Sequence, residues 1–528
     1  MSAGLVERDV AATSDRSARD ARLRWWLTYL CAVVVGLGVA GVAYKRSAQL
    51  YLGVCLAVLL LLWAAWARFP KAALTATVFL ALVGDQITVS WFPFIKNLSS
   101  PESIFYVADS VSVSPLELTL LWALLVTGYR QLVESRRLVR GGALGRPLAV
   151  YVACCALGLA VGLGAGGDVR VAIFEVRPFL LLPIAYVVVT NVCRTRADYG
   201  HLLVAALVAV VVQSLLSLRY LDRLDPEERA GLETLTEHGA AIGMNLLFVV
   251  TVMTLLARGA PFAARAALCL ACLPVLWVYL VAERRAAVVA LGGGLALVAL
   301  QLLWHRRAVF WRVVPAVALA TIAYTGAFWN STSTAGFPAQ AIKSVVAPDQ
   351  LDAVNQSSDL YREIEKYDLS ATIRSAPVLG RGFGQVFLRP VPLPDISAFF
   401  EFDEYIPHNS LLYVWIKLGF VGFVAFLYLL ARTMALGAAR IRAGSTTRDD
   451  VTTTAFVAFA LMFAVYLYVE IAWEPRNVVL LAIAMGVATG RLDDDPTAPP
   501  EQPVEGARRG LRLVGPGTER RARVPADR

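Results

Sequence analysis

Long runs of apolar residues, separated by shorter polar and charged segments, make up most of the chain. Many of these runs reach the ~20 residues that an α-helix needs to cross the roughly 30 Å hydrocarbon core of a membrane. The runs are continuous rather than alternating between apolar and polar positions, which favours helices over strands. The pattern predicts an all-α, polytopic transmembrane helical bundle.

The apolar runs predict about fourteen membrane spans in one domain over residues 25–490. We place them at residues 25–44, 48–67, 72–91, 116–129, 147–163, 171–192, 201–218, 240–256, 266–281, 286–304, a run ending near 329, 410–434, 452–471 and a run ending at 490. The polar tails over residues 1–24 and 491–528 are expected to be disordered and cytoplasmic.

The distribution of basic residues predicts which side of the membrane each loop occupies. The most basic short loop contains Arg130, Arg136, Arg137, Arg140 and Arg146, and such loops are typical of the cytoplasmic side. Counting spans from this loop puts both termini in the cytoplasm and the large polar loop over residues 330–407 outside. Within that loop, Leu360, Ile364, Tyr367 and Ile373 follow a helical rhythm. This rhythm suits a helix that lies on the membrane surface or caps a cavity.

Composition narrows the classes of function. Hydrophobic residues make up 58% of the chain and charged residues 17%, below the ~25% usual for soluble domains. The net charge of +9 comes from basic residues in loops on alternate sides, so we expect no nucleic-acid partner. Most of the seven cysteines fall inside apolar runs. They indicate neither a disulfide framework nor a metal site, and we expect no metal and no cofactor.

His408 is the strongest candidate for an acid or base. It is one of four histidines, and it stands at the junction Pro407-His408-Asn409-Ser410, where the large polar loop meets an apolar helix. Its charge can change near neutral pH, as proton transfer requires. The alternative is a residue that only precedes a helix capped by Asn409 or Ser410.

Several arginines are candidates for binding an anion. Glu283-Arg284-Arg285 lies on a short loop that is outside by count, where basic residues are usually few. A guanidinium offers rigid, forked donors that match phosphate oxygens, so this pair predicts a clamp for a lipid diphosphate. The alternative is a chance exception to a statistical rule. Arg362 lies in the large loop, and its alternative role is that of a solvated charge.

Two further arginines are candidates because of their surroundings. Arg177 lies with Glu175 in the sixth predicted span, where a charge is costly unless it is paired or lines a cavity. A side chain that reaches to the outer interface is the alternative. Arg381 stands inside Gly380-Arg381-Gly382-Phe383-Gly384, and a glycine turn lets backbone amides approach an anion.

Three segments resemble the O-antigen ligase and O-antigen polymerase (Wzy-like) superfamily of bacterial membrane glycosyltransferases. Residues 407–412, Pro-His-Asn-Ser-Leu-Leu, and residues 418–422, Leu-Gly-Phe-Val-Gly, resemble its His-Asn-x-x-Leu and Leu-Gly-x-x-Gly signature. Tyr361-Arg362 and residues 376–384 are similar to its arginine followed by Pro-x-x-Gly-x-Gly-x-Gly. Glu283-Arg284-Arg285 looks like its Ser-Arg patch, with Glu283 where a small hydroxyl residue is common.

The resemblance implies a type C glycosyltransferase-like architecture in the plasma membrane, with the active site facing outward. It implies a donor glycan on a polyprenyl diphosphate, and transfer to a hydroxyl of a glycan, lipid or protein acceptor without metal or nucleotide. Arg284 or Arg285 together with Arg362 would hold the diphosphate, and His408 would activate the acceptor or stabilise the leaving group. Asn409 and Glu283 would support them. Arg177 and Arg381 are added from their positions alone.

Two other classes of function remain open. A transporter or flippase of lipid-linked oligosaccharide would need charges deep within several spans, whereas strong charges here gather near the outer ends of spans. A structural membrane protein would need neither the arginine pair nor an ordered polar loop.

Overall fold

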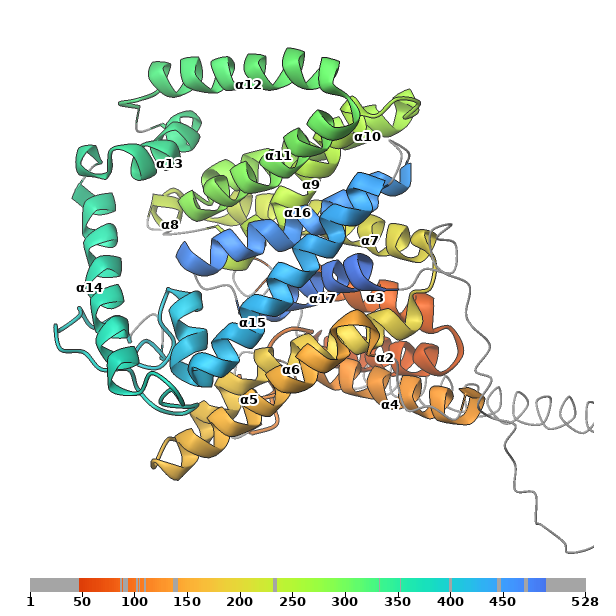
Figure 1. Ribbon diagram of the computed structural model, residues 1–528, viewed down its shortest axis with the longest axis vertical. Coiled ribbons are helices and arrows are strands. Elements are labelled where there is room, and N and C mark those ends of the chain that lie inside the picture. Colours follow the sequence, from red (N-terminus) through yellow and green to blue (C-terminus); the bar gives the residue numbers. More distant parts are fainter. Residues whose placement is uncertain are drawn as a thin grey trace, which may run out of the picture.

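The computed structural model describes residues 47–85, 88, 94–100, 103, 105–108, 111–135, 141–230, 235–331, 333–351, 353–397, 401–443, 448–469 and 473–490. The span expected at residues 25–44 and both predicted tails lie outside these residues. Within them the chain folds as a bundle of helices (Figure 1).

Most of the helices follow the apolar runs. The helices are α2 (Ser47–Arg68), α3 (Pro70–Val83), α4 (Pro115–Ser135), α5 (Gly145–Gly164), α6 (Val169–Val192), α7 (Arg196–Arg223), α8 (Pro226–Ala230), α9 (His238–Leu256), α10 (Phe262–Val281), α11 (Arg285–His305), α12 (Arg307–Ala327), α13 (Phe337–Val346), α14 (Ala353–Ser375), α15 (Ser410–Ala443), α16 (Arg448–Val469) and α17 (Pro475–Thr489). Of these, α8, α13 and α14 lie in segments expected to be polar loops.

Among the described residues, nine helices are long and apolar enough to cross a membrane, and three shorter apolar ones are α17, α3 and the part of α2 from Leu52 to Arg68. The chain is therefore a multi-pass membrane protein, but the expected number of about fourteen spans is not confirmed. The third expected span, residues 72–91, extends beyond the end of the helix that forms there. Its helix α3 ends at Val83, because Gly84 takes an extended conformation with φ −66° and ψ 137°.

The centre of the bundle is α17, in which every side chain from Arg476 to Thr489 is buried. It packs against α6, α16 and α15, and α16 in turn packs against α11, α9 and α15. Helices as apolar as these are held together by close packing of their side chains. Lipid tails are equally apolar, so a contact between two helices gains no hydrophobic advantage over a contact with lipid.

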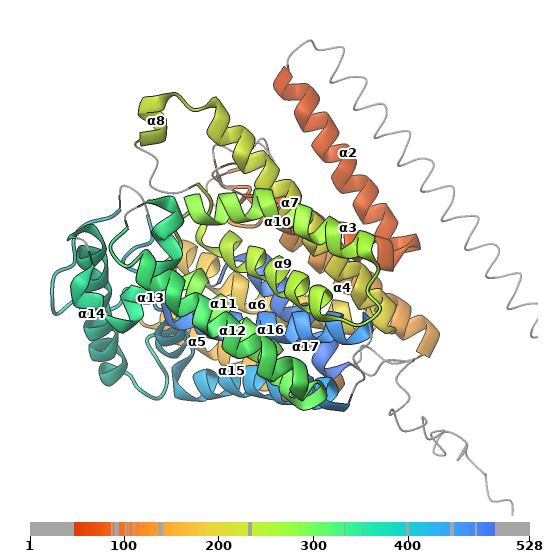
Figure 2. The same cartoon turned by 90° about the horizontal axis from the view of Figure 1, so that it is seen from above.

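One end of the bundle is covered by the segment between α12 and α15. Figure 1 shows α14 lying across this end, and Figure 2 shows it there again from above, beside α13. The helical rhythm expected around residues 359–373 is therefore confirmed. Its apolar residues do not form one buried stripe, however: Leu360 and Tyr367 are 57% and 54% exposed, whereas Ile373 packs against the buried Leu369. Glu365 and Asp368 face inward and are buried.

Candidate active site

A cavity of about 290 Å³ lies under α14, between the first turns of α11 and α15. Four of the residues singled out in the sequence meet there: Arg285, Arg362, His408 and Asn409. The remaining wall consists of Ala286, Val289, Ser344, Val345, Pro348, Asp359, Glu363, Glu365, Lys366 and Tyr468. The fold thus brings together segments that are more than a hundred residues apart in the chain.

His408 is held by one buried carboxylate. Its Nδ1 lies 3.1 Å from Oε1 of Glu365, and its backbone N–H donates to both oxygens of the same carboxylate, also at 3.1 Å. The ring of Tyr361 meets the imidazole edge-on, with 5.5 Å between ring centroids. The Glu365 side chain is 2% exposed and that of His408 is 22% exposed, so the imidazole forms part of the cavity wall on a buried support.

Asn409 caps the helix that begins after His408. Its Oδ1 accepts a hydrogen bond from the backbone N–H of Leu412 at 3.0 Å, which is the bond expected of an N-cap. His408 therefore precedes a capped helix, which is the alternative to a catalytic role that the sequence left open. The same residue also lies on the cavity wall, so the two interpretations do not exclude each other.

Arg285 binds a carboxylate with both arms of its guanidinium. The distances are 3.2 Å from Nη1 to Oδ2 of Asp359 and 2.9 Å from Nη2 to Oδ1, and this ion pair links α11 to α14. Arg362 and Lys366 add two further cations to the wall, and the ammonium of Lys366 lies 5.2 Å from the ring centroid of Tyr468. Asp359, Glu363 and Glu365 balance these charges.

Two helix N-termini contribute to the same wall. Ala286, in the first turn of α11, and Asn409, the cap of α15, both line the cavity. The positive end of a helix dipole favours an anion at this position by about 0.3–1 kcal/mol each. Together with Arg285 and Arg362 they make this wall suited to a phosphate group, provided that the ligand competes with Asp359.

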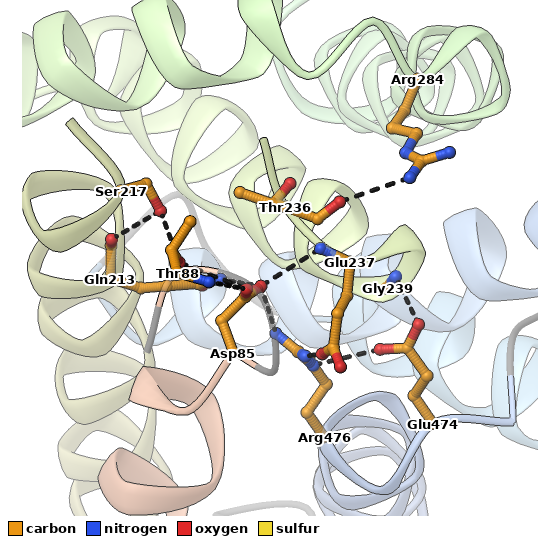
Figure 3. Close-up of polar contacts among 10 residues, drawn as sticks. All are labelled: Asp85, Thr88, Gln213, Ser217, Thr236, Glu237, Gly239, Arg284, Glu474 and Arg476. Atoms are coloured by element: carbon orange, nitrogen blue, oxygen red, sulfur yellow. Dashed lines mark hydrogen bonds and ion pairs between the residues drawn. The ribbon is translucent and has the colours of Figure 1, made fainter. Parts of the chain in front are cut away.

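Arg284 points to a different environment. Its Nη2 donates to the backbone carbonyl of Thr236 at 3.3 Å, as Figure 3 shows. The next residue, Glu237, forms an ion pair with the buried Arg476, which also contacts Glu474 at 3.1 Å. Glu283 itself adopts a left-handed backbone conformation, with φ 50°. Neither Arg284 nor Glu283 is among the residues that line the cavity.

Arg476 anchors a wider polar network beneath the α10–α11 turn (Figure 3). Its Nη1 lies 3.7 Å from Oδ2 of Asp85, whose carboxylate also accepts hydrogen bonds from Gln213 and from the backbone N–H of Glu237. Buried charges need partners of this kind. The network joins α17, α7 and the start of α9, and through Thr236 it reaches Arg284 at the start of α11.

Arg177 and Arg381 also lie away from the cavity wall. Arg177 donates to Oδ1 of Asn97 at 2.8 Å and lies 3.5 Å from Oε1 of Glu117. Its position inside a span is thus explained by pairing. The backbone N–H of Arg381 donates to the carbonyl of Ile416 at 2.7 Å.

The glycine turn around Arg381 packs against the bundle. The N–H of Phe383 donates to the carbonyl of Gly158 on α5, and the N–H of Gly384 donates to Glu175 at 2.6 Å. The protein itself binds these amides, whereas the sequence suggested that they would face an anion. Gly382 has φ 80°, and a Cβ on it would lie 2.3 Å from the backbone nitrogen of Gly162, so only glycine fits here.

Sequence reasoning missed the polar face of α14. Asp359, Arg362, Glu363 and Lys366 follow the spacing i, i+3, i+4 and i+7, which places them on one face of a helix. That spacing was visible next to the apolar rhythm and could have predicted a charged face over the cavity. Nothing in the sequence singled out Glu365 as the partner of His408.

The comparison with known families agrees with the resemblance seen in the sequence. No curated protein matches the chain. Residues 270–427 match the family model described as O-antigen ligase. The matched segment runs from α10 to the middle of α15, and so contains Arg285, the whole of α14 and His408. Through this segment, the membrane-embedded chain is similar to the O-antigen ligase family.

Proposed function

We propose that the protein is a glycosyltransferase of the ligase or polymerase type. It transfers a glycan from a polyprenyl diphosphate to an acceptor hydroxyl at the outer face of the plasma membrane. The observation that carries the proposal is the meeting of Arg285, Arg362 and His408 on one cavity within the matched segment. The combination supplies cations for a diphosphate and a titratable base beside it.

The two arginines on the cavity wall are suited to bind the leaving group. As the bond between the sugar and the diphosphate breaks, negative charge accumulates on the phosphate oxygens. Arg285 and Arg362 would meet that charge, and fixed donors of this kind stabilise a transition state most where water is excluded. The starts of α11 and α15 add their dipoles in the same region.

His408 is suited to activate the acceptor hydroxyl. In the proposed step, His408 takes the proton of the acceptor hydroxyl, and the hydroxyl oxygen forms a bond to the anomeric carbon of the donor sugar. The bond from that carbon to the diphosphate oxygen breaks, and its electron pair leaves with the polyprenyl diphosphate. A positioned base typically contributes about 10²–10⁴-fold to a rate.

Arg177, Arg284 and Arg381 receive supporting parts in this proposal. Arg177 ties α6 to α4 through Glu117, Arg284 ties the α10–α11 turn to Thr236, and the segment around Arg381 seats the glycine turn against α15. In this proposal they hold these elements together rather than touching the diphosphate.

A transfer assay tests the proposal. Purified wild-type protein and His408→Ala are incubated with a polyprenyl-diphosphate oligosaccharide and an acceptor, with and without a chelator. We expect product from the wild type in both conditions and a loss of about 10²–10⁴-fold in His408→Ala. His201→Ala, which removes an exposed histidine on α7, serves as the matched control and keeps its activity.

Two outcomes would contradict the proposal. Product at wild-type levels from His408→Ala would remove the histidine from the reaction. Movement of the lipid-linked donor across liposome membranes, with no product from any variant, would instead favour a transporter. The chain lengths of the product would distinguish a polymerase from a ligase.

A further inference from the structure

Glu365 is a buried acid whose contacts converge on one residue. It is 1% exposed, and both of its carboxylate oxygens lie 3.1 Å from the backbone nitrogen of His408. Oε1 lies 3.1 Å from Nδ1 of the same residue as well. A single carboxylate therefore fixes both the main chain and the side chain of His408.

This contact determines which nitrogen of the imidazole carries the proton. Both oxygens of Glu365 already accept the backbone N–H of His408, so Nδ1 meets an acceptor and is itself the donor. The neutral ring then keeps its lone pair on Nε2. The edge-on contact with Tyr361 restricts rotation of the ring from a second side. The result is a base whose tautomer and direction are set before any substrate binds.

We propose that Glu365 is a positioning residue for glycan transfer: it holds His408 in the tautomer whose Nε2 can accept the proton of the acceptor hydroxyl. This inference rests on the proposed function. It deepens that function, because it assigns a part to a residue that neither the sequence pattern nor the family match singles out.

A purely structural part for Glu365 is the competing explanation. The two hydrogen bonds from the backbone of His408 connect α14 to the start of α15. Their loss would loosen the packing of α14 over the cavity without any effect on proton transfer. The two explanations differ in what they predict for the pH profile and for a protein that already lacks the imidazole.

The first experiment compares Glu365→Gln, Glu365→Asp and wild type across pH in the transfer assay. The amide of Gln can donate to Nδ1 and reverse the tautomer, so we expect kcat to fall about 10²-fold while the KM for the donor stays within about twofold. Loss of the carboxylate also disfavours the imidazolium ion, so the acidic limb of the profile moves to lower pH. Glu365→Asp keeps the charge and recovers part of kcat.

The pH profile needs a control because other charged groups face the same cavity. They are Asp359, Arg362, Glu363 and Lys366 from α14 and Arg285 from α11. Asp368→Asn supplies the control: Asp368 is a buried carboxylate one turn further along α14, and it accepts a hydrogen bond from the backbone of Val391 at 3.1 Å. We expect this variant to leave the acidic limb where it is in the wild type.

The second experiment places Glu365→Gln in the His408→Ala background. A positioning residue acts through the imidazole, so the second substitution is expected to cause no further loss there. An equal fold-loss in both backgrounds would overturn the inference, and so would a wild-type kcat with an unmoved acidic limb in Glu365→Gln. Full activity in His408→Ala would instead refute the base in the proposed function, so the two failures can be told apart.

Discussion

In the proposed reaction, Arg285 is the residue on which donor binding would depend most directly. Its fork matches two phosphate oxygens, and a lysine in its place would offer a single point charge. We expect Arg285→Lys to raise the KM for the donor about tenfold and Arg285→Ala about a hundredfold, since a hydrogen bond to a charged group is worth about 1.5–3 kcal/mol. Titration of the lipid-linked donor against each variant measures this directly. An unchanged KM in both would show that the diphosphate binds elsewhere.

In the proposed reaction, Asp359 would compete with the donor for the same guanidinium. Because it binds Arg285 through two hydrogen bonds, a diphosphate has to displace it or share the arginine with it. We expect Asp359→Asn to lower the KM for the donor, as the ion pair is weakened while the side-chain shape is kept. A higher KM in this variant would mean that Asp359 orients Arg285 for the donor instead of competing with it.

Tyr361 is expected to stay neutral throughout the useful pH range. Burial and the nearby carboxylate of Glu365 raise the pKa of Tyr361 to about 12. A raised pKa means that the phenol keeps its proton until the pH approaches that value. Tyr361→Phe, which retains the ring beside His408, should therefore leave the alkaline side of the pH–rate profile unchanged up to about pH 10. A shift of that limb in the variant would show that the phenol titrates earlier.

At the scale of the elements, the glycine turn of residues 380–384 packs against α6 and α15 through buried polar contacts. Lys417 and Glu175 are almost fully buried and lie 2.8 Å apart, and Glu175 also accepts the N–H of Gly384. Removing one partner of such a pair leaves an uncompensated charge, which costs about 3–5 kcal/mol. Lys417→Met is expected to lower the thermal unfolding midpoint in detergent accordingly.

The double variant Lys417→Met with Glu175→Gln is the control for this contact. It removes both charges and keeps an acceptor for Gly384, so most of the lost stability should return. A double variant as unstable as Lys417→Met alone would show that the ammonium itself, through its 2.7 Å hydrogen bond to the carbonyl of Gln385, holds the turn.

The helices could be predicted from the sequence, but the partners of their charges could not. Apolar runs mark helices through burial in lipid, and a charge inside a run shows that a partner or cavity must exist. Arg177 met that condition, yet its partner Glu117 lies 60 positions earlier, and only the packing of α6 on α4 brings them together. The sequence shows which residues share a face of α14, but which of its faces is buried depends on how the helix packs against the bundle.

The same reasoning explains which parts of the site were found. Arg285, Arg362, His408 and Asn409 were singled out by their loops and by the family resemblance, and they meet on one cavity. Arg284 was equivalent to Arg285 in the sequence. The helix start separates them, since Arg285 is the first residue of α11 and Arg284 turns back to Thr236.

For the whole molecule, the arrangement of helices places the cavity at one end and the α9–α10 connection at the other. Helix α10 leads from that connection to the turn before Arg285, so Arg258 and the cavity are separated by the length of a span. The segment between α14 and α15, which contains the exposed Asp395, lies at the cavity end. If the transfer reaction occurs outside the cell, Asp395 and Arg258 must lie on opposite sides of the membrane.

Single cysteines test this orientation. In a background without the seven native cysteines, Asp395→Cys and Arg258→Cys are treated with a membrane-impermeant maleimide in right-side-out and inside-out vesicles. We expect Asp395→Cys to react in right-side-out vesicles and Arg258→Cys only in inside-out ones, because basic loops such as the one at Arg258 stay in the cytoplasm. The opposite pattern would put the cavity in the cytoplasm. Donor and acceptor would then have to meet before export, and the proposed site of polymer transfer would be wrong even if the chemistry were right.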